Sequence, residues 1–221
     1  MSKALFIYGS PKQEKSSSHA FGKYLMDKLK EQGMEIDEAY TYRAVRSEEN
    51  MKEALAKMDQ ADLVILGFPL YVDSIPSRTI KFMEAANEHR KGREGKQQRF
   101  AALCHSGFPE SHQNDYAIRI CSVFAQESGF TWAGGLSIGQ GGGAESMDLA
   151  TAGKMMRHFT SALDMTAAAL AQEKDVPKEA QVEIAKGMAP KWLFVLIVNR
   201  GWKKRAKANG VDRKAMPYKG P

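Results

Sequence analysis

Four short apolar runs along the chain predict buried β-strands. They are KALFIYG (3–9), DLVILGF (62–68), FAALCHSG (100–107) and FTWAGGLSIG (130–139). Near-continuous apolar runs of this length are typical of strands that are covered on both faces of a parallel sheet. A fifth segment, MEIDEAYTY (34–42), alternates apolar and polar residues, which indicates a strand at the edge of the sheet.

Segments with helical spacing lie between these runs, as Phe21, Leu25 and Leu29 illustrate at intervals of four residues. The predicted helices run from near His19 to Gly33 and over residues 47–61, about 76–88, 114–129 and roughly 146–172. The charged stretch 88–99 is predicted to be a solvated turn. Strands that alternate with helices predict an α/β fold with a doubly wound, five-stranded parallel sheet. Ligands of such sheets bind in the loops at the carboxyl ends of the strands.

The composition, 43% hydrophobic and 26% charged over 221 residues, is that of a globular protein with one main domain. No apolar run approaches the roughly 20 residues that span a bilayer. The apolar part of the N-terminus is too short for a signal peptide. Cys104 and Cys121 lie far apart in the sequence, so neither a metal site nor a disulfide framework is indicated. These features favour a cytoplasmic protein.

The net charge of +6 is concentrated at the C-terminus. From Pro190 onward nine Lys and Arg residues oppose only Asp212, which gives this stretch +8 and leaves residues 1–189 at −2. A nearly neutral body argues against nucleic-acid binding there. Within the basic stretch, Trp192–Val198 are seven consecutive apolar residues. They predict either a helix packed on the body or on a second subunit, which we favour, or a membrane-surface anchor.

The loop after the first strand carries hydroxyl groups where a helix should begin. Ser10, Ser16, Ser17 and Ser18 precede a helix N-terminus, whose unpaired N–H groups and partial positive charge favour a phosphate. Neither the G-x-x-x-x-G-K-[ST] phosphate loop nor G-x-G-x-x-G occurs in this loop, so a metal-free phosphate monoester is the remaining ligand class. On spacing alone, an equal alternative is that one serine caps the helix and the others form a polar loop.

The loop after the third strand, GFPLYVDSIPS, combines rigid backbone with an apolar and aromatic wall. Pro69, Leu70, Tyr71 and Val72 could hold a flat ring system. The alternative is that Tyr71 packs on its own loop.

Together the two loops, GSPKxxxSxS (9–18) and PLYVDSIPSxxxKFME (69–84), resemble the NAD(P)H-dependent FMN reductase family over about residues 1–170. The resemblance implies a flavodoxin-like fold that binds FMN. By position, the phosphate would contact Ser10, Lys12, Ser16, Ser17 and Ser18, and the ring would contact Pro69, Leu70, Tyr71 and Val72. Lys12 stands where the family often has Arg, and the cysteine cluster of its iron–sulfur relatives is absent.

The loop after the fourth strand, CHSGFPESHQN (104–114), should flank the other side of the ring. Ser106, Gly107 and Phe108 are the predicted ring neighbours, and Glu110, Ser111 or His112 could reach the flavin edge. Because neighbouring strand residues point to opposite faces, Cys104 is predicted to lie in the core, and His105 to face the ligand without a proton-transfer role.

A glycine-rich loop, GQGGGAE (139–145), follows the fifth strand. It formally matches the dinucleotide fingerprint, but no further strand completes the unit. We expect a flexible loop near the flavin, which could touch a nicotinamide ligand or a second subunit.

The sequence therefore predicts a flavodoxin-like FMN-binding domain over residues 1–175 and a basic, helical extension over 176–221. The expected activity is that of an FMN-dependent oxidoreductase that takes hydride from NAD(P)H and passes electrons to a quinone, flavin or similar small acceptor. No catalytic side chain is required, because the cofactor supplies the chemistry. The alternatives are a flavodoxin-like electron carrier and a membrane-surface or regulatory module. A homodimer is expected.

Overall fold

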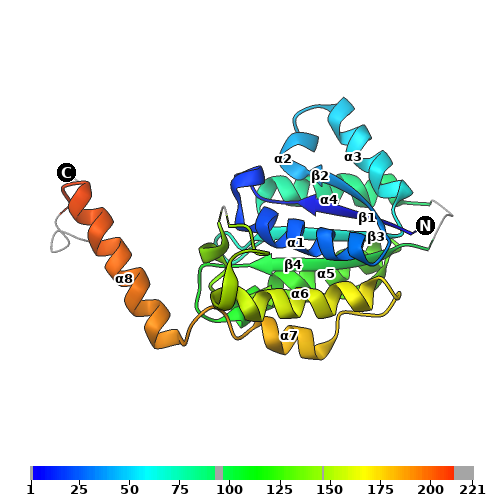
Figure 1. The fold of residues 1–221 in the computed structure, drawn as a ribbon. Helices are drawn as coiled ribbons and strands as arrows, with labels where there is room; N and C mark the ends of the chain where they lie inside the picture. The colour runs from blue at the N-terminus through cyan, green and yellow to red at the C-terminus, as the bar shows by residue number, and fades with distance from the viewer. Residues whose placement is uncertain (1, 93–96, 146, 212–221) are drawn as a thin grey trace, which may run out of the picture. The chain divides into compact units, whose positions relative to one another are not determined.

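Five parallel strands form one sheet in the computed structural model, which describes residues 2–92, 97–145 and 147–211 (Figure 1). The order across the sheet is β2-β1-β3-β4-β5, which confirms the predicted doubly wound α/β fold. The strands are β1 (Lys3–Tyr8), β2 (Glu35–Tyr40), β3 (Leu63–Pro69), β4 (Arg99–His105) and β5 (Thr131–Ile138).

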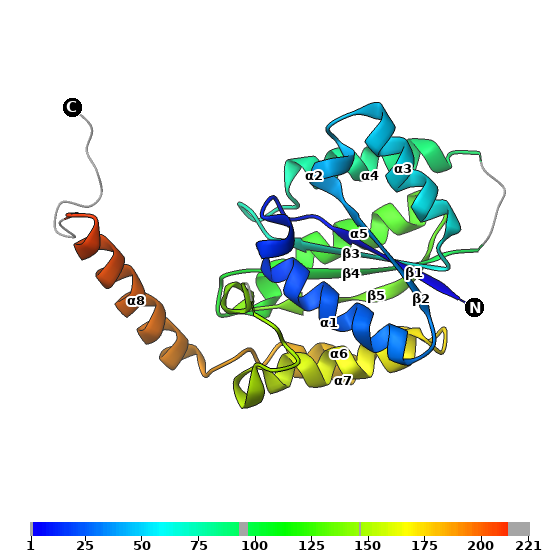
Figure 2. The same cartoon turned by 45° about the horizontal axis from the view of Figure 1, so that its top comes forward.

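Helices cover both faces of the sheet (Figures 1 and 2). The core on one face is completed by α1 (Ser17–Glu31), α6 (Arg157–Leu170) and α7 (Lys178–Ile184). The core on the other face is completed by α2 (Thr41–Ala44), α3 (Glu48–Gln60), α4 (Ser77–Arg90) and α5 (Asp115–Glu127). Short 3₁₀ turns, η1 (Gln13–Lys15), η2 (Ser111–Asn114), η3 (Gly141–Ala144) and η4 (Gly153–Met156), lie in the loops.

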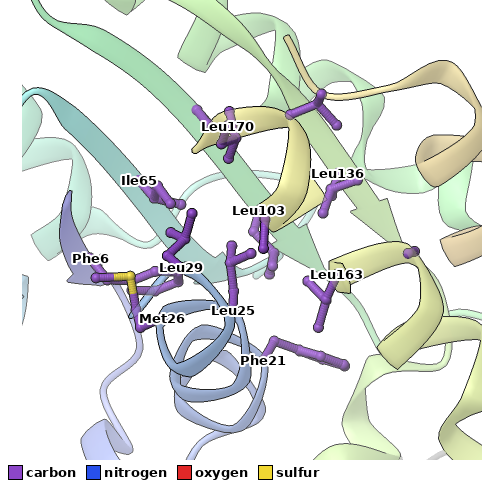
Figure 3. Close-up of a cluster of buried hydrophobic side chains, with 14 of the residues drawn as sticks. Phe6, Phe21, Leu25, Met26, Leu29, Ile65, Leu103, Leu136, Leu163 and Leu170 are labelled. Carbon is purple, nitrogen blue, oxygen red and sulfur yellow. The ribbon is translucent and has the colours of Figure 1, made fainter. Parts of the chain in front are cut away.

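Alternation along the strands divides the core into these two layers. Phe6 and Ile65 pack with α1, where Leu25 and Leu29 lie against them (Figure 3), whereas Leu5 belongs to the opposite layer. Burying each such side chain contributes about 1.5–3 kcal/mol. Because both faces are covered, β1 and β3 are nearly continuously apolar, which is why the sequence revealed them. Both cysteines, Cys104 and Cys121, are unpaired and fully buried in the α3–α5 layer.

Two boundaries near the first loop differ from the sequence prediction. Helix α1 begins at Ser17 rather than near His19, because the Ser16 side chain caps it by accepting a hydrogen bond from the His19 amide at 3.1 Å. Strand β2 ends at Tyr40, and the one-turn helix α2 replaces the last predicted strand residues.

The long helix predicted over 146–172 is wrong before residue 157. Ser146 lies outside the described residues, and helix α6 begins only at Arg157. Before it, the Asp148 carboxylate accepts a hydrogen bond from the Ala150 amide, and Gly153 has a φ of +67°. A left-handed residue interrupts a right-handed helix, so the Ala-rich composition was misleading here. Of the predicted charged turn, residues 88–90 belong to α4, and 93–96 lie outside the described part.

The chain divides into two compact units, residues 1–188 and 189–221. This division falls after the boundary placed at residue 175 from the sequence. Helix α7 belongs to the first unit, where the amide of Val176 donates to the carbonyl of Ala133 at 2.8 Å and α7 residues complete the core beside α6. The second unit contains α8 (Lys191–Ala208). In the described part of the chain, no helix is both long enough and apolar enough to cross a membrane.

Candidate functional site

A small cavity of about 150 Å³ lies where the loops after β1, β3, β4 and β5 meet. Of the residues predicted to contact the phosphate or to neighbour the ring, all line it except Ser18, Val72 and Phe108. The residues around it are Ser10, Lys12, Ser16, Ser17, Pro69, Leu70, Tyr71, His105, Ser106, Gly107, Gly142 and Glu145. The cavity is therefore at the carboxyl edge of the sheet, where doubly wound folds bind ligands.

The serines of the first loop have different positions and tasks. The Ser16 hydroxyl is engaged as the cap of α1 and donates to the Gln13 carbonyl, while the Ser10 hydroxyl accepts from the Lys12 amide at 3.3 Å. Ser17 occupies the first helical position at the cavity wall. The capping role that spacing offered as an alternative to phosphate binding therefore holds for Ser16, while Ser10 and Ser17 also line the cavity.

The N-terminus of α1 makes the cavity favourable for an anion. Amides in the first turn of a helix have no intrahelical acceptor and together carry about half a positive charge. Lys12 adds a full charge at the same wall. The loop approaches β3 closely at residue 9, which is glycine. A methyl group there would lie 2.8 Å from both Phe68 Cβ and Thr79 Oγ1, so a larger residue would not fit.

Ser18 lies one residue further into α1 and points into the interior. Its hydroxyl is 2.8 Å from Nε2 of His105, and both side chains are buried. Burial lowers the pKa of His105 to about 3, so the ring is neutral at physiological pH. The structure thus places His105 at the cavity wall and Ser18 behind it, which differs from the phosphate-binding position expected for Ser18.

A salt bridge joins the first and last loops across the mouth of the site. Lys12 Nζ lies 2.7 Å from Glu145 Oε1, with about half of each side chain exposed. Glu145 and Gly142 both line the cavity, so the glycine-rich loop contributes to the site. The sequence analysis had placed this loop near the ligand but had not singled out Glu145, because nothing in the local pattern indicates a partner 133 residues away.

The loop after β3 forms the apolar wall. The amide of Leu70 donates to the carbonyl of His105 at 2.8 Å, and Tyr71 and Ser74 exchange two backbone hydrogen bonds. This tight turn gives Val72 a φ of 49°, a left-handed conformation that is uncommon for a β-branched residue. The Val72 side chain is 99% exposed and does not line the cavity, in contrast to Tyr71.

The loop after β4 supplies a buried polar atom that lacks a partner. The amide of Ser106 donates to Ile138, but its hydroxyl oxygen is buried without a hydrogen bond within the described chain. A buried hydroxyl in this condition is costly unless a ligand or water satisfies it. Nothing lies within 4 Å of the position that a Gly107 methyl group would take, so this side of the site is open.

Phe108 and the residues after it lie outside the cavity. The Phe108 side chain is 46% exposed, and its carbonyl accepts a hydrogen bond from the Gln140 amide at 2.7 Å. Glu110, Ser111 and His112 also do not line the cavity. Their proposed approach to a ligand edge therefore has no support from this arrangement.

The backbone amides, hydroxyls and single lysine at one wall of the cavity are suited to an anion and are called the anion cradle below, and a proline, a leucine and a tyrosine form the adjoining wall. Among the described residues, no group of three or more His, Cys, Asp or Glu side chains could hold a metal ion.

A model of the flavodoxin-like fold family matches residues 2–117, which is more than half of the chain and includes the loops after β1, β3 and β4. This match confirms the resemblance stated from the two loop motifs. No curated protein matches the chain significantly.

Several solved structures share the fold at low sequence identity. A putative quinone reductase from Klebsiella pneumoniae is 17% identical with a TM-score of 0.55, and the match covers 80% of this chain and 88% of that one. An FMN-dependent NADH-azoreductase from Bacillus anthracis str. Ames Ancestor, solved with FMN, is 16% identical with a TM-score of 0.52, covering 77% and 100%. A flavodoxin from the domain Archaea is 12% identical with a TM-score of 0.52, covering 77% and 97%.

Proposed function

Because the chain belongs to the flavodoxin-like fold family, we propose that it binds FMN and acts as an NAD(P)H-dependent oxidoreductase. Electrons would pass to a quinone, a free flavin or a similar small acceptor. The observation that carries this proposal is the convergence of an anion cradle and an apolar, aromatic wall around one cavity at the carboxyl edge of the sheet.

The residues at this edge fit FMN in two respects. The cavity of about 150 Å³ is below the 300 Å³ or more that is usual for whole ligands, so it suits the phosphate, and the ring of FMN would extend beyond it along Leu70 and Tyr71. The unpartnered Ser106 hydroxyl offers a hydrogen bond to a polar ligand atom.

The protein's part is to bind and orient the cofactor. The first-turn amides of α1, with Lys12, would hold the phosphate, and Leu70 and Tyr71 would contact the ring. When bound, FMN supplies the redox chemistry by accepting hydride from NAD(P)H and passing electrons on. Buried His105 is neutral and adds no charge to the cradle, so its part is to hold Ser18 of α1 through the 2.8 Å contact.

An electron carrier is the second candidate, since the archaeal flavodoxin and the azoreductase have equal TM-scores to this chain. The charge distribution favours the enzyme, because residues 1–189 carry a net charge of only −2 whereas carriers tend to be strongly acidic.

We also propose a cytoplasmic location, which suits two unpaired cysteines.

The test is an absorbance spectrum of the purified protein, FMN titration of flavin-free protein by fluorescence quenching, and anaerobic titration with NADH and NADPH. We expect FMN to bind and to be reduced. Protein without flavin absorbance or quenching contradicts the proposal. Bound FMN with no NAD(P)H oxidation in the presence of a quinone favours the carrier.

A matched pair of lysines tests the cradle itself. Lys12→Gln should weaken FMN binding about tenfold, which corresponds to one lost charged contact, and should leave riboflavin binding unchanged. Lys15→Gln removes the same charge from an exposed position of the same loop outside the cavity, and should affect neither ligand.

We further propose that the protein is a homodimer through an apolar groove of about 550 Å³ between α4 and α5. Ile80, Ile120 and Val123 are each at least a third exposed there. Arg119 and Glu84 lie at the same groove, so a two-fold related copy could place opposite charges against each other. Apolar surface of this kind is usually an interaction site.

A further inference from the structure

Within its own unit, residues 189–221, helix α8 buries none of its 18 residues, and Trp192 and Trp202 are among the exposed ones. In globular proteins most helix stability comes from packing of an apolar face, and a helix that is apolar all round is normally buried. A chain with such a helix needs something that covers it.

The polarity of α8 changes along its axis and not around it. Trp192–Val198 are apolar on every side over about 10 Å of helix, at 1.5 Å per residue. The half that follows carries five basic residues: Arg200, Lys203, Lys204, Arg205 and Lys207. No Asp or Glu occurs between residues 189 and 211. One end of the helix therefore suits an apolar medium and the other suits a negatively charged surface.

The need for an apolar surrounding at one end of α8 and a negatively charged surface at the other is met poorly by a protein groove, a second copy of α8 or a nucleic acid. A protein groove covers one stripe of a helix and would leave the other sides of Leu196 and Ile197 in water. A parallel second copy of α8 would bring two basic halves together, and like charges repel, whereas an antiparallel copy would set each basic half against an apolar segment. A nucleic acid would satisfy the basic half but leave the apolar half exposed.

We propose that α8 binds the surface of an anionic lipid bilayer. The Trp192–Val198 segment enters the boundary between headgroups and acyl chains, and the five basic residues contact lipid phosphates. Tryptophans favour this interfacial depth, and one lies in each half of the helix. The apolar segment is far shorter than the roughly 30 Å hydrocarbon core, so the helix lies in the interface without spanning it. The inference is independent of the FMN proposal.

The experiment is co-sedimentation of the full-length protein with vesicles of pure phosphatidylcholine or of phosphatidylcholine with one third phosphatidylglycerol. We expect binding to the anionic vesicles to exceed binding to the neutral ones about tenfold, and high salt to reduce it. FMN content, measured by absorbance, provides a separate readout, so loss of lipid binding cannot be confused with loss of flavin binding.

Three variants separate charge from apolar contact. The triple change Lys203→Gln, Lys204→Gln and Arg205→Gln should abolish the preference for anionic vesicles. Leu196→Ser with Ile197→Ser should weaken binding to both kinds of vesicle about tenfold or more. As a charge-matched control, Lys30→Gln, Lys52→Gln and Lys178→Gln on exposed positions of the body should leave binding unchanged.

Four results would overturn the proposal. The first is no sedimentation of the wild-type protein with either vesicle. The second is equal, salt-insensitive binding to neutral and anionic vesicles. The third is a loss of binding in the body control as large as in the α8 charge variant. Binding of the protein to duplex DNA in preference to anionic vesicles also contradicts it.

Discussion

The imidazole of His105 and the hydroxyl of Ser18 lie 2.8 Å apart in the interior, although 87 residues separate them in the chain. Ser18 belongs to the first turn of α1 and His105 ends β4, so the contact joins the helix of the anion cradle to the strand beneath it. This contact fixes the start of α1 against β4, while the His105 imidazole stays uncharged. The uncharged state of His105 and the close packing around it can each be tested by measuring stability.

Stability should depend on pH through His105. Its pKa is lowered by burial from 6.5 to about 3, so on acidification the unfolded chain takes up a proton before the folded one does. Stability is therefore fully present above about pH 6.5 and falls toward pH 3, by up to about 1.4 kcal/mol per pH unit. His105→Asn should flatten this slope in urea unfolding between pH 7 and pH 4.

The control for this prediction is His112→Asn, which removes an exposed histidine. It should keep the wild-type slope. A slope unchanged by His105→Asn would mean that His105 is not held neutral in the folded protein.

Two adjacent glycines should differ in how far an added methyl group lowers the stability of the protein. A methyl group at Gly141 would lie 2.7 Å from His105 Cβ, whereas one at Gly142 meets nothing within 4 Å. Gly141→Ala should therefore destabilise the protein by about 1–3 kcal/mol. Gly142→Ala should change stability by less than about 0.5 kcal/mol. Chemical unfolding of both variants measures the difference, and equal effects would contradict the observed packing.

Glu145 should oppose phosphate binding. Its carboxylate lies 2.7 Å from Lys12 Nζ at the cavity, where it occupies the lysine and repels an anion. Because both side chains are about half exposed, Glu145→Gln should tighten FMN binding only about two- to fivefold. Riboflavin binding, measured by the same quenching assay, should not change. Asp148→Asn, an exposed acid near the same loop, should have no such effect.

The proposed dimer depends on the groove between α4 and α5. Ile120→Glu places a charge in its apolar strip and should convert a dimer to a monomer in analytical ultracentrifugation. Val182→Glu on α7 alters an exposed valine outside the groove and should leave the dimer intact. A wild-type protein that sediments as a monomer at micromolar concentration would remove the basis for this interface.

Sequence reasoning predicted the fold because strands that are buried on both faces consist mainly of apolar residues. The runs that became β1, β3 and β4 are apolar except at their ends, since helices cover them on both sides. The same reasoning failed before α6, where the turn at Asp148 and the left-handed Gly153 interrupt an Ala-rich segment. Short-range turn geometry of this kind has little effect on the average hydrophobicity of a window.

The site was predictable in part for a related reason. Loops that follow parallel strands must meet at one edge, so Ser17, Tyr71 and Ser106 could be brought together from topology alone. The direction of each side chain could not. Ser17 and Ser18 are neighbours on α1, yet Ser17 lies at the cavity and Ser18 lies in the interior. At Val72, which has a φ of 49°, the side chain does not line the cavity.

The burial of both thiols has a practical consequence. Cys104 and Cys121 are fully enclosed, and burial raises the pKa of each well above its ordinary value, so the folded protein presents no reactive thiolate. A single cysteine introduced at an exposed position of α8 outside the apolar segment, such as Ala208, would then be the one that maleimide reagents modify under native conditions. A fluorescent or spin label placed there would report directly whether this helix changes its surroundings when vesicles are added, without any need to remove the native cysteines.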